Sequence, residues 1–198
     1  MIQIHKIVNN ILYSCTYLIS HNRHNWVYMI DCGDLSQITK YLSINNLVLK
    51  GVFLTHTHYD HIYGLNSLLT EYPKARVYTT EDGLKALQSP KLNFSKYHSE
   101  IEDFVLIYPQ SVSFLKDQQA INLFDDINMD IIPTPGHDIT CLSYCIGKYV
   151  FTGDSYIPKC KLVCTFPRSD KKMAHESENL LKKLECNGFI VMPGHYII

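Results

Sequence analysis

The chain has 198 residues, of which 46% are hydrophobic, so it is long enough to bury one substantial core and we expect a single domain over residues 1–198. The formal net charge is −1, and only three of the 18 basic residues are arginines, at Arg23, Arg76 and Arg168. This balance excludes the basic face of a dedicated nucleic-acid-binding protein, so we expect a small-molecule substrate and no nucleic-acid partner.

The first twenty residues predict neither a signal peptide nor a membrane anchor. They carry a histidine, a lysine and two asparagines, and their apolar residues alternate with polar ones. No apolar run approaches the roughly 20 residues that span a bilayer, so the expected compartment is the cytoplasm. There the seven cysteines should be reduced, and none has the C-x-x-C spacing typical of a zinc site. We therefore interpret them as small buried hydrophobic residues.

The first half of the chain mixes strands and helices. Strands are predicted at residues 2–8, 11–20, 26–31, 51–55 and 76–80, with a turn at residues 9–10 between the first two. One helix begins at Asp34, a good N-cap residue, and a second begins at about His61 and ends at Pro73. A short helix follows over residues 81–88. Residues 89–109 show no clean period, and we expect an insertion that forms a lid over the site.

The second half begins another series of strands. They are predicted at residues 120–124, 129–133, 141–146, 149–152 and 188–192. A helix capped by Ser169 or Asp170 precedes the last of them. Strands followed by helices, twice in the chain, predict an α/β fold in which two mixed sheets pack together with helices outside.

Four apolar strands each end in side chains that can bind a metal ion. The segment GVFLTHTHYDH supplies four of them, and the segments MDIIPTPGHD, KYVFTGDS and GFIVMPGHY supply one each. Strand ends are where a rigid scaffold presents functional groups. Five histidines and two aspartates buried together with nothing to neutralise them would be costly, so the pattern indicates bound cations.

The spacing within this set suggests two metal ions. His56 and His58 are two residues apart, so on an extended backbone they share one face and can bind one ion. Asp60 and His61 follow where the chain turns into a helix, and they can bind a second ion. The expected ligands are His56, His58 and His137 for the first ion, Asp60, His61 and His195 for the second, and Asp154 as a bridge.

Taken together, these segments resemble the metal-binding motifs of the metallo-β-lactamase superfamily. THTHYDH, TPGHD, FTGDS and PGH stand in the family's order, and VYMIDCG resembles its early aspartate motif, at Asp31. The resemblance extends from about residue 2 to residue 196. It implies a four-layer αβ/βα sandwich with the site at one edge of the two sheets, and the same seven ligands. It also implies that Asp31 braces the site without binding metal.

The complete ligand set most resembles the glyoxalase II-like branch of that family. Two departures are HIYG, where a Gly-Gly pair is common, and GHDITCLSY, which replaces the usual run of small residues. The chain also ends three residues after His195, whereas glyoxalase II enzymes continue into a helical domain that helps to bind the glutathione thioester. This counts against that substrate. The large inserted domain of the RNA- and DNA-processing members is absent as well.

The leading hypothesis is a metal-dependent hydrolase, in which a metal-bound hydroxide at a dinuclear centre cleaves a thioester, an ester or lactone, or a related bond. Zinc is the expected metal, although iron or manganese would fit the same ligands. Asp60 is the candidate catalytic residue, because a carboxylate there can orient the water or accept its proton.

Three alternatives stay open. The first is a persulfide dioxygenase with a single iron ion, which would have no need of the second ligand set. The second is a phosphodiesterase or nuclease, against which the near-neutral charge counts. The third is a metal-binding protein without catalytic activity, which the complete ligand set disfavours.

One further segment, YIPKCKLVCTFPR, follows Asp154 directly. It carries Lys159, Lys161 and Arg168. These cations either bind an anionic group or belong to a solvated loop, and we favour the loop.

Overall fold

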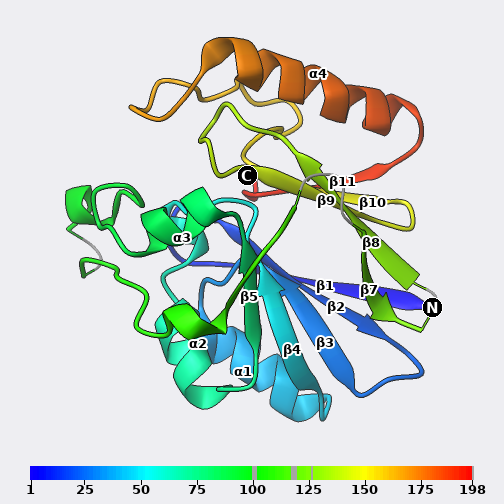
Figure 1. Cartoon of the computed structure of the whole chain (residues 1–198). Helices are drawn as coiled ribbons and strands as arrows, with labels where there is room; N and C mark the ends of the chain where they lie inside the picture. Colours follow the sequence, from blue (N-terminus) through cyan, green and yellow to red (C-terminus); the bar gives the residue numbers. More distant parts are fainter. Residues whose placement is uncertain (100–101, 117–119, 126, 198) are drawn as a thin grey trace.

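Two β-sheets packed face to face form the centre of the molecule, with helices on their outer sides (Figure 1). The computed structural model describes residues 1–99, 102–116, 120–125 and 127–197. The layers follow in the order helix, sheet, sheet, helix, so the predicted α/β sandwich is confirmed. The interpretation of residues 1–198 as a single domain stays a prediction.

The first sheet contains six strands, in chain order from one edge to the other. They are β1 (Ile2–Val8), β2 (Cys15–His21), β3 (Trp26–Ile30), β4 (Val48–Phe53), β5 (Arg76–Thr79) and β6 (Val112–Phe114). Strand β2 is antiparallel to both of its neighbours, β1 and β3, whereas β3 to β6 are parallel. Parallel neighbours need crossover connections, which α1 (Leu35–Ile44), α2 (Leu65–Glu71) and α3 (Glu81–Leu87) provide.

The second sheet has the order β11–β10–β9–β8–β7. Its strands are β7 (Ala120–Phe124), β8 (Ile127–Pro133), β9 (Leu142–Ile146), β10 (Tyr149–Gly153) and β11 (Ile190–Pro193). Only the pair β10 and β11 is parallel, and α4 (Lys171–Cys186) connects them across the outer face. Of the two predicted caps for this helix, Asp170 is the one used, because its side chain accepts a hydrogen bond of 2.9 Å from the Met173 backbone N–H.

Alternation along the strands separates the core into layers. On β2, Leu18 faces the apolar residues of α1 and α2, whereas Tyr17 and Ile19 face the second sheet. Phe53 and Phe151 meet in that layer between the sheets. A smaller cluster that includes Val150 and Leu181 lies beneath α4. The first sheet is therefore buried on both faces at its centre, which explains the continuous apolar runs in the sequence.

Hydrogen bonds join the two sheets just beyond the end of β4. The Tyr144 hydroxyl group on β9 donates to the Leu54 carbonyl oxygen at 2.6 Å, and the Leu142 N–H donates to the Thr55 carbonyl oxygen at 2.7 Å. These bonds fix the point at which the chain leaves the first sheet, immediately before His56.

The predicted strand at residues 11–20 is wrong at its start, because β2 begins only at Cys15. Leu12 and Tyr13 instead have left-handed backbones, with φ of 52° and 54°. The Tyr13 carbonyl oxygen accepts from the Tyr196 N–H at 2.9 Å, and the Cys15 N–H donates to Gly194 at 2.7 Å. The C-terminal segment thus determines this turn, and the asparagine pair alone does not.

Two other expectations need correction. Residues 59–61 form a 3-10 turn, and α2 begins later than predicted, at Leu65. The short strand β6 was not predicted, because it has too few residues to show a period.

Within the described residues, no helix combines the length and the hydrophobicity that crossing a bilayer requires.

We predict that Tyr144→Phe destabilises the protein by about 1–3 kcal/mol, because the buried Leu54 carbonyl oxygen loses its donor. The measurement is the free energy of unfolding in urea. The matched control is Tyr149→Phe on the neighbouring β10, where the ring is half-buried and we expect a change below about 0.5 kcal/mol. Equal effects of the two substitutions would contradict this account.

Candidate metal centre

The seven side chains proposed from the sequence converge at one place. Their ligand atoms form three overlapping groups, within each of which all atoms lie within 4.8 Å of one another. These groups are His56, His58 and His137; His56, His61 and Asp154; and Asp60, His61 and His195. The structure thus brings the seven side chains together, and their role as metal ligands stays a prediction.

The first group lies where β4 and β8 end. His56 and His58 follow β4 on extended backbone, and the Nδ1 atom of His58 is 3.0 Å from the Nε2 atom of His137. The rings of His56 and His58 have centroids 4.5 Å apart, as expected for residues on one face of an extended segment. All three side chains are buried.

The second group joins the 3-10 turn to the segment after β11. The Nε2 atoms of His61 and His195 are 3.3 Å apart, and each is 3.3 Å from Oδ2 of Asp60. Gly194 precedes His195 and lies so close to Asp154 that a Cβ atom there would collide with the carboxylate. The small residue in the PGH segment is therefore a steric requirement.

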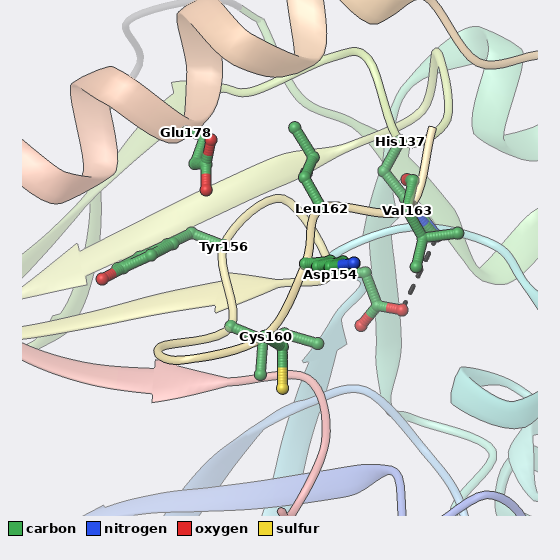
Figure 2. Close-up of a pocket in the computed structure, with 9 residues that line it drawn as sticks. His137, Asp154, Tyr156, Cys160, Leu162, Val163 and Glu178 are labelled. Atoms are coloured by element: carbon green, nitrogen blue, oxygen red, sulfur yellow. Dashed lines mark hydrogen bonds and ion pairs between the residues drawn. The ribbon is translucent and has the colours of Figure 1, made fainter. Parts of the chain in front are cut away.

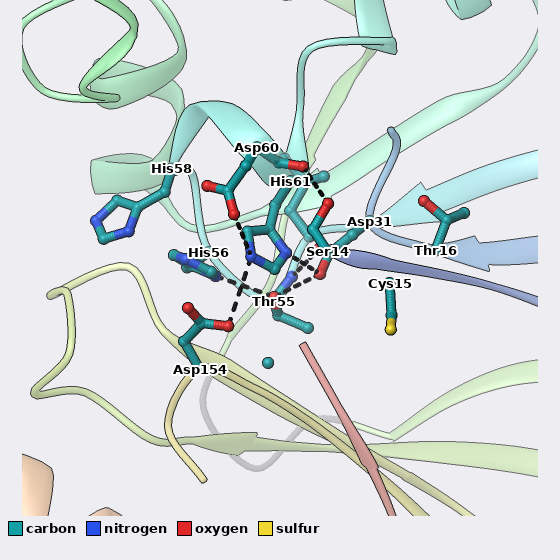
Figure 3. Close-up of polar contacts among 12 residues, drawn as sticks. Ser14, Cys15, Thr16, Asp31, Thr55, His56, His58, Asp60, His61 and Asp154 are labelled. Carbon is teal, nitrogen blue, oxygen red and sulfur yellow. Dashed lines mark hydrogen bonds and ion pairs between the residues drawn. The ribbon is translucent and has the colours of Figure 1, made fainter. Parts of the chain in front are cut away.

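Asp154, at the end of β10, lies between the two groups. Its Oδ2 atom is 3.6 Å from Nε2 of His137 and 3.2 Å from Nε2 of His195, and its Oδ1 atom is 3.5 Å from Nε2 of His61. Figure 3 shows His61 with Asp31 on one side and Asp60 and Asp154 on the other. A single carboxylate thus reaches ligands from both groups.

Four of the imidazole rings have their second nitrogen within hydrogen-bond distance of a fixed oxygen, which sets the orientation of the ring. The partners of the Nδ1 atoms are Thr55 Oγ1 for His56 (3.1 Å), Asp31 Oδ2 for His61 (2.9 Å), the Val163 carbonyl for His137 (2.7 Å) and the Leu12 carbonyl for His195 (2.8 Å).

Asp31 occupies the bracing position that the family resemblance implied. Its carboxylate accepts hydrogen bonds of 2.7 Å from both the N–H and the hydroxyl group of Thr55, in addition to its contact with His61. Its own backbone has a left-handed φ of 57°, which aspartate tolerates better than most residues. Asp31 thereby connects β3, the start of the histidine segment and the second ligand group.

The fifth histidine, His58, has a charged neighbour that the sequence interpretation missed. Its Nε2 atom is 3.7 Å from Oδ2 of the fully buried Asp138. Asp138 also accepts from the Thr140 N–H at 2.9 Å, and its Oδ1 atom is 3.2 Å from a guanidinium nitrogen of Arg168. The position of Asp138 next to His137 in the sequence could have marked it as a residue of the site. Sequence spacing alone cannot show that its side chain points to His58.

The charges in this cluster oppose one another strongly. Burial disfavours the charged form of His61, but the carboxylates of Asp60, Asp154 and Asp31 raise its pKa well above the ordinary value. Burial would likewise raise the pKa of Asp154, yet His61 and His195 hold it well below its usual range. Protons and imidazolium charge therefore balance the carboxylates when no metal is bound.

The donor set fits a transition-metal ion. The buried atoms His56 Nε2 and Asp154 Oδ1 have no hydrogen-bond partner in the part of the chain that the structure describes. Burial, followed by the neighbouring His61 and His58, holds the pKa of His56 well below its ordinary value, so this ring is in the neutral form that binds metal. Imidazole nitrogens and carboxylate oxygens are typical ligands of zinc, iron and manganese.

A pocket of about 180 Å³ opens onto the cluster. Asp60, His137, Asp154 and His195 line it together with residues of three loops. Phe94 and His98 come from the segment 89–109, so this segment forms part of the wall. That it closes over the site as a lid stays a prediction.

A second, smaller pocket also borders Asp154 and His137 and extends to Glu178 on α4 (Figure 2). Its volume of about 20 Å³ is enough for roughly one water molecule. Tyr156, Cys160 and Glu178 line it, and the Tyr156 hydroxyl group donates to Glu185 at 2.6 Å. This pocket is too small for a substrate, so the larger pocket is the candidate binding site.

Comparisons with known proteins agree with this geometry. A sequence model of the metallo-beta-lactamase superfamily matches residues 12–195. The chain is 29% identical to a probable metallo-hydrolase of Streptococcus pyogenes serotype M6, over 99% of this chain and 82% of that protein. It is also 29% identical to a hydroxyacylglutathione hydrolase of Pseudoalteromonas translucida over 89% of this chain, and spans 58% of that protein's length.

Among solved structures, the BLEG-1 B3 metallo-beta-lactamase superposes with a TM-score of 0.86 at 19% identity, over 98% of this chain and 92% of that one. At this identity the likeness establishes the fold.

We predict that Asp138→Asn weakens metal binding by about 10- to 100-fold, because His58 loses the charge that orients and polarises its ring. The measurement is competition for zinc with a chelator of known affinity. Asp130→Asn, at an exposed position on β8, is the matched control and should leave the affinity unchanged. A zinc affinity equal in both variants would rule out a role for Asp138 at His58.

Proposed function

The chain belongs to the metallo-beta-lactamase superfamily, and from this premise we propose that it is a hydrolase that uses two divalent ions to cleave an acyl bond in a small molecule. The bond is a thioester, an ester or lactone, or a related linkage. One observation carries the proposal: the three ligand groups share members. His56 and His61, which with Asp154 form the middle group, also belong to the first and the third group, so the two predicted ion sites lie next to each other.

We assign the ligands from these groups. His56, His58 and His137 would hold one ion, and Asp60, His61 and His195 the other. Asp154 would bind both, because its two oxygens together face His137, His195 and His61. Zinc is the metal we propose for this histidine-rich set.

In the proposed reaction, the bound ions and the residues of the chain have separate roles. Bound ions would supply an activated water and polarise the carbonyl group. Asp60 lines the pocket, and burial opposes its charged form, but His61 beside it lowers its pKa. It is therefore a carboxylate at neutral pH, placed to orient the attacking water and to accept its proton. The Ser14 hydroxyl group holds the backbone of this residue in place by donating to the Asp60 carbonyl oxygen at 2.7 Å.

The relatives support hydrolysis more firmly than any one substrate. One is named a probable metallo-hydrolase and another a hydroxyacylglutathione hydrolase. Because this chain spans 58% of the second protein's length, its glutathione thioester is not carried over to this chain. The fold itself does not select the substrate, which depends on the loops around the pocket.

Elemental analysis of the purified protein tests the proposal, and we expect two zinc ions per chain. Removal by a chelator should abolish hydrolysis of thioesters, esters and lactones, and restored zinc should recover it. Zinc at about 100 times its dissociation constant should raise Tm by roughly 5–10 °C for each site filled, and therefore by roughly 10–20 °C for two sites. One iron ion per chain together with oxygen uptake would instead support the persulfide dioxygenase alternative.

We predict that Asp60→Asn lowers kcat by about 100- to 10,000-fold, because the amide cannot accept the proton of the attacking water. The three-histidine group should still bind its ion, which metal analysis of the same preparation can check. The exposed Asp130→Asn is again the control and should retain full activity. Wild-type kcat in Asp60→Asn would remove this residue from the mechanism.

A further inference from the structure

The larger pocket has apolar walls around a polar floor. Five of its lining residues are aromatic or aliphatic, namely Leu12, Tyr59, Phe94, Val163 and Phe166. The others are histidines and the two aspartates of the metal centre. No lysine or arginine lines it among the residues that the structure describes. Apart from His98, whose ring stacks on Tyr59 with centroids 4.0 Å apart, the histidines and carboxylates of the lining belong to the metal centre.

Two phenylalanines form the wall above the first ligand group. The Phe94 and Phe166 ring centroids are 5.2 Å apart, and both rings lie edge-on to His58, with centroids at 4.8 and 5.2 Å. Phe166 also contacts the ring of His137 at 5.5 Å. An acyl chain that extends from a carbonyl group at the metal centre would therefore run along these rings.

The wall is held in place by its own loop. Phe94 has a left-handed φ of 66°, a strained conformation for a bulky residue, and its side chain is only 9% exposed. The preceding residue, Asn93, is fully buried and donates to the carbonyl oxygens of Ala86 and Phe104 at 3.1 and 3.0 Å. The pocket is thus preformed on this side, which favours a specific binding surface.

At the mouth of the pocket, large apolar side chains lie open to solvent. Leu12 is 55% exposed, Val163 46% and Phe166 38%. Both Leu12 and Val163 give their carbonyl oxygens to ligand histidines, so their backbones are fixed by the metal centre while their side chains face the opening. Exposed apolar residues around a polar centre are typical of a ligand-binding site.

Two cations near the site, Arg168 and Lys161, do not line the larger pocket. Arg168 lies 3.2 Å from Asp138, and its side chain is 16% exposed. Lys161 lines the small pocket and does not line the large one. Beyond the metal centre, an anionic group on the acyl part of a substrate would therefore meet apolar walls and the ring of His98, with no lysine or arginine among the described lining residues to neutralise it, which is unfavourable.

From these observations we propose that the site selects an uncharged acyl group with a short apolar chain, and that Phe166 is a specificity-determining residue. The inference rests on the proposed hydrolase function. In that reaction water adds to the acyl carbonyl, the bond to the leaving group breaks, and an acid and a thiol or alcohol are released. The acyl chain stays against Phe94 and Phe166 throughout.

The test uses the zinc-loaded full chain and thioesters that share one neutral leaving group, N-acetylcysteamine. Each added methylene should raise kcat/KM about fourfold, so butanoyl should exceed acetyl by roughly 15-fold. Succinyl has the same chain length as butanoyl but carries a carboxylate, and its kcat/KM should be lower by about 100-fold. This pair separates charge from size.

Variants of Phe166 locate the effect. Phe166→Ala should lower kcat/KM for butanoyl by about 10-fold and for acetyl by less than about twofold. Phe166→Leu should retain most of the chain-length preference, and Phe166→Arg should improve succinyl relative to butanoyl. Phe114→Ala removes an exposed phenylalanine of β6 that does not line the pocket, so it is the matched control and should leave both rates unchanged.

Binding of alkyl hydroxamates, measured by calorimetry, reports on the pocket without turnover. Affinity that rises from acetyl to butanoyl to hexanoyl hydroxamate, and falls with a terminal carboxylate, supports the inference even if every thioester is inert. Inert substrates would overturn the hydrolase function alone. A pocket that takes succinyl as well as butanoyl, or a Phe166→Ala variant with unchanged chain-length preference, would overturn the inference.

Discussion

The structure depends on the electrostatic balance of a largely buried cluster of five imidazoles and two carboxylates. Isolated charges at such depth are unstable, so the cluster requires either bound protons or bound cations. Without metal, His61 carries the balancing charge, because Asp60, Asp154 and Asp31 together raise its pKa. The atoms His56 Nε2 and Asp154 Oδ1 nevertheless have no hydrogen-bond partner within the described residues. Divalent ions would satisfy both needs at once, since they bind the free donors and replace the protons.

The surroundings of the cluster are organised to keep each ring in one orientation. Asp31 and Thr55 follow directly after strands β3 and β4 of the first sheet, whereas the carbonyl groups of Leu12 and Val163 belong to loops that also form the pocket mouth. Each of these two loops therefore supplies an apolar wall residue and, through the carbonyl group of that residue, orients a ligand histidine. Any shift of these loops would move the metal ligands and the substrate pocket together.

The separation between strands that carry ligands and connections that carry the walls explains how one scaffold can support different substrates. The ligands come from the ends of β4, β8, β10 and β11, which the two-sheet core holds rigidly. The walls come instead from residues 12, 94, 163 and 166, which lie in connections between those strands and helices. Substitutions in the connections change what the pocket accepts without altering the strands that carry the chemistry.

The sequence by itself determined the elements whose signals are local. Alternation and turn residues located most strands, and a spacing of two placed His56 and His58 on one face. The order of the four motifs was enough to predict that seven distant side chains meet, because strand ends of one sandwich converge at an edge. Asp170 was recognised as one of two possible caps for the same reason, since an N-cap acts within three residues.

Only the tertiary structure decided the features that depend on distant partners. The first turn ends at Ser14 because residues 13 and 15 bond to the C-terminal segment, about 180 residues away. Asp138 could be assigned to His58, and Phe94 to Phe166, only once the sheets and loops were packed. Local patterns fix periodicity and capping, whereas contacts between segments depend on how the layers pack, which no single stretch of sequence encodes.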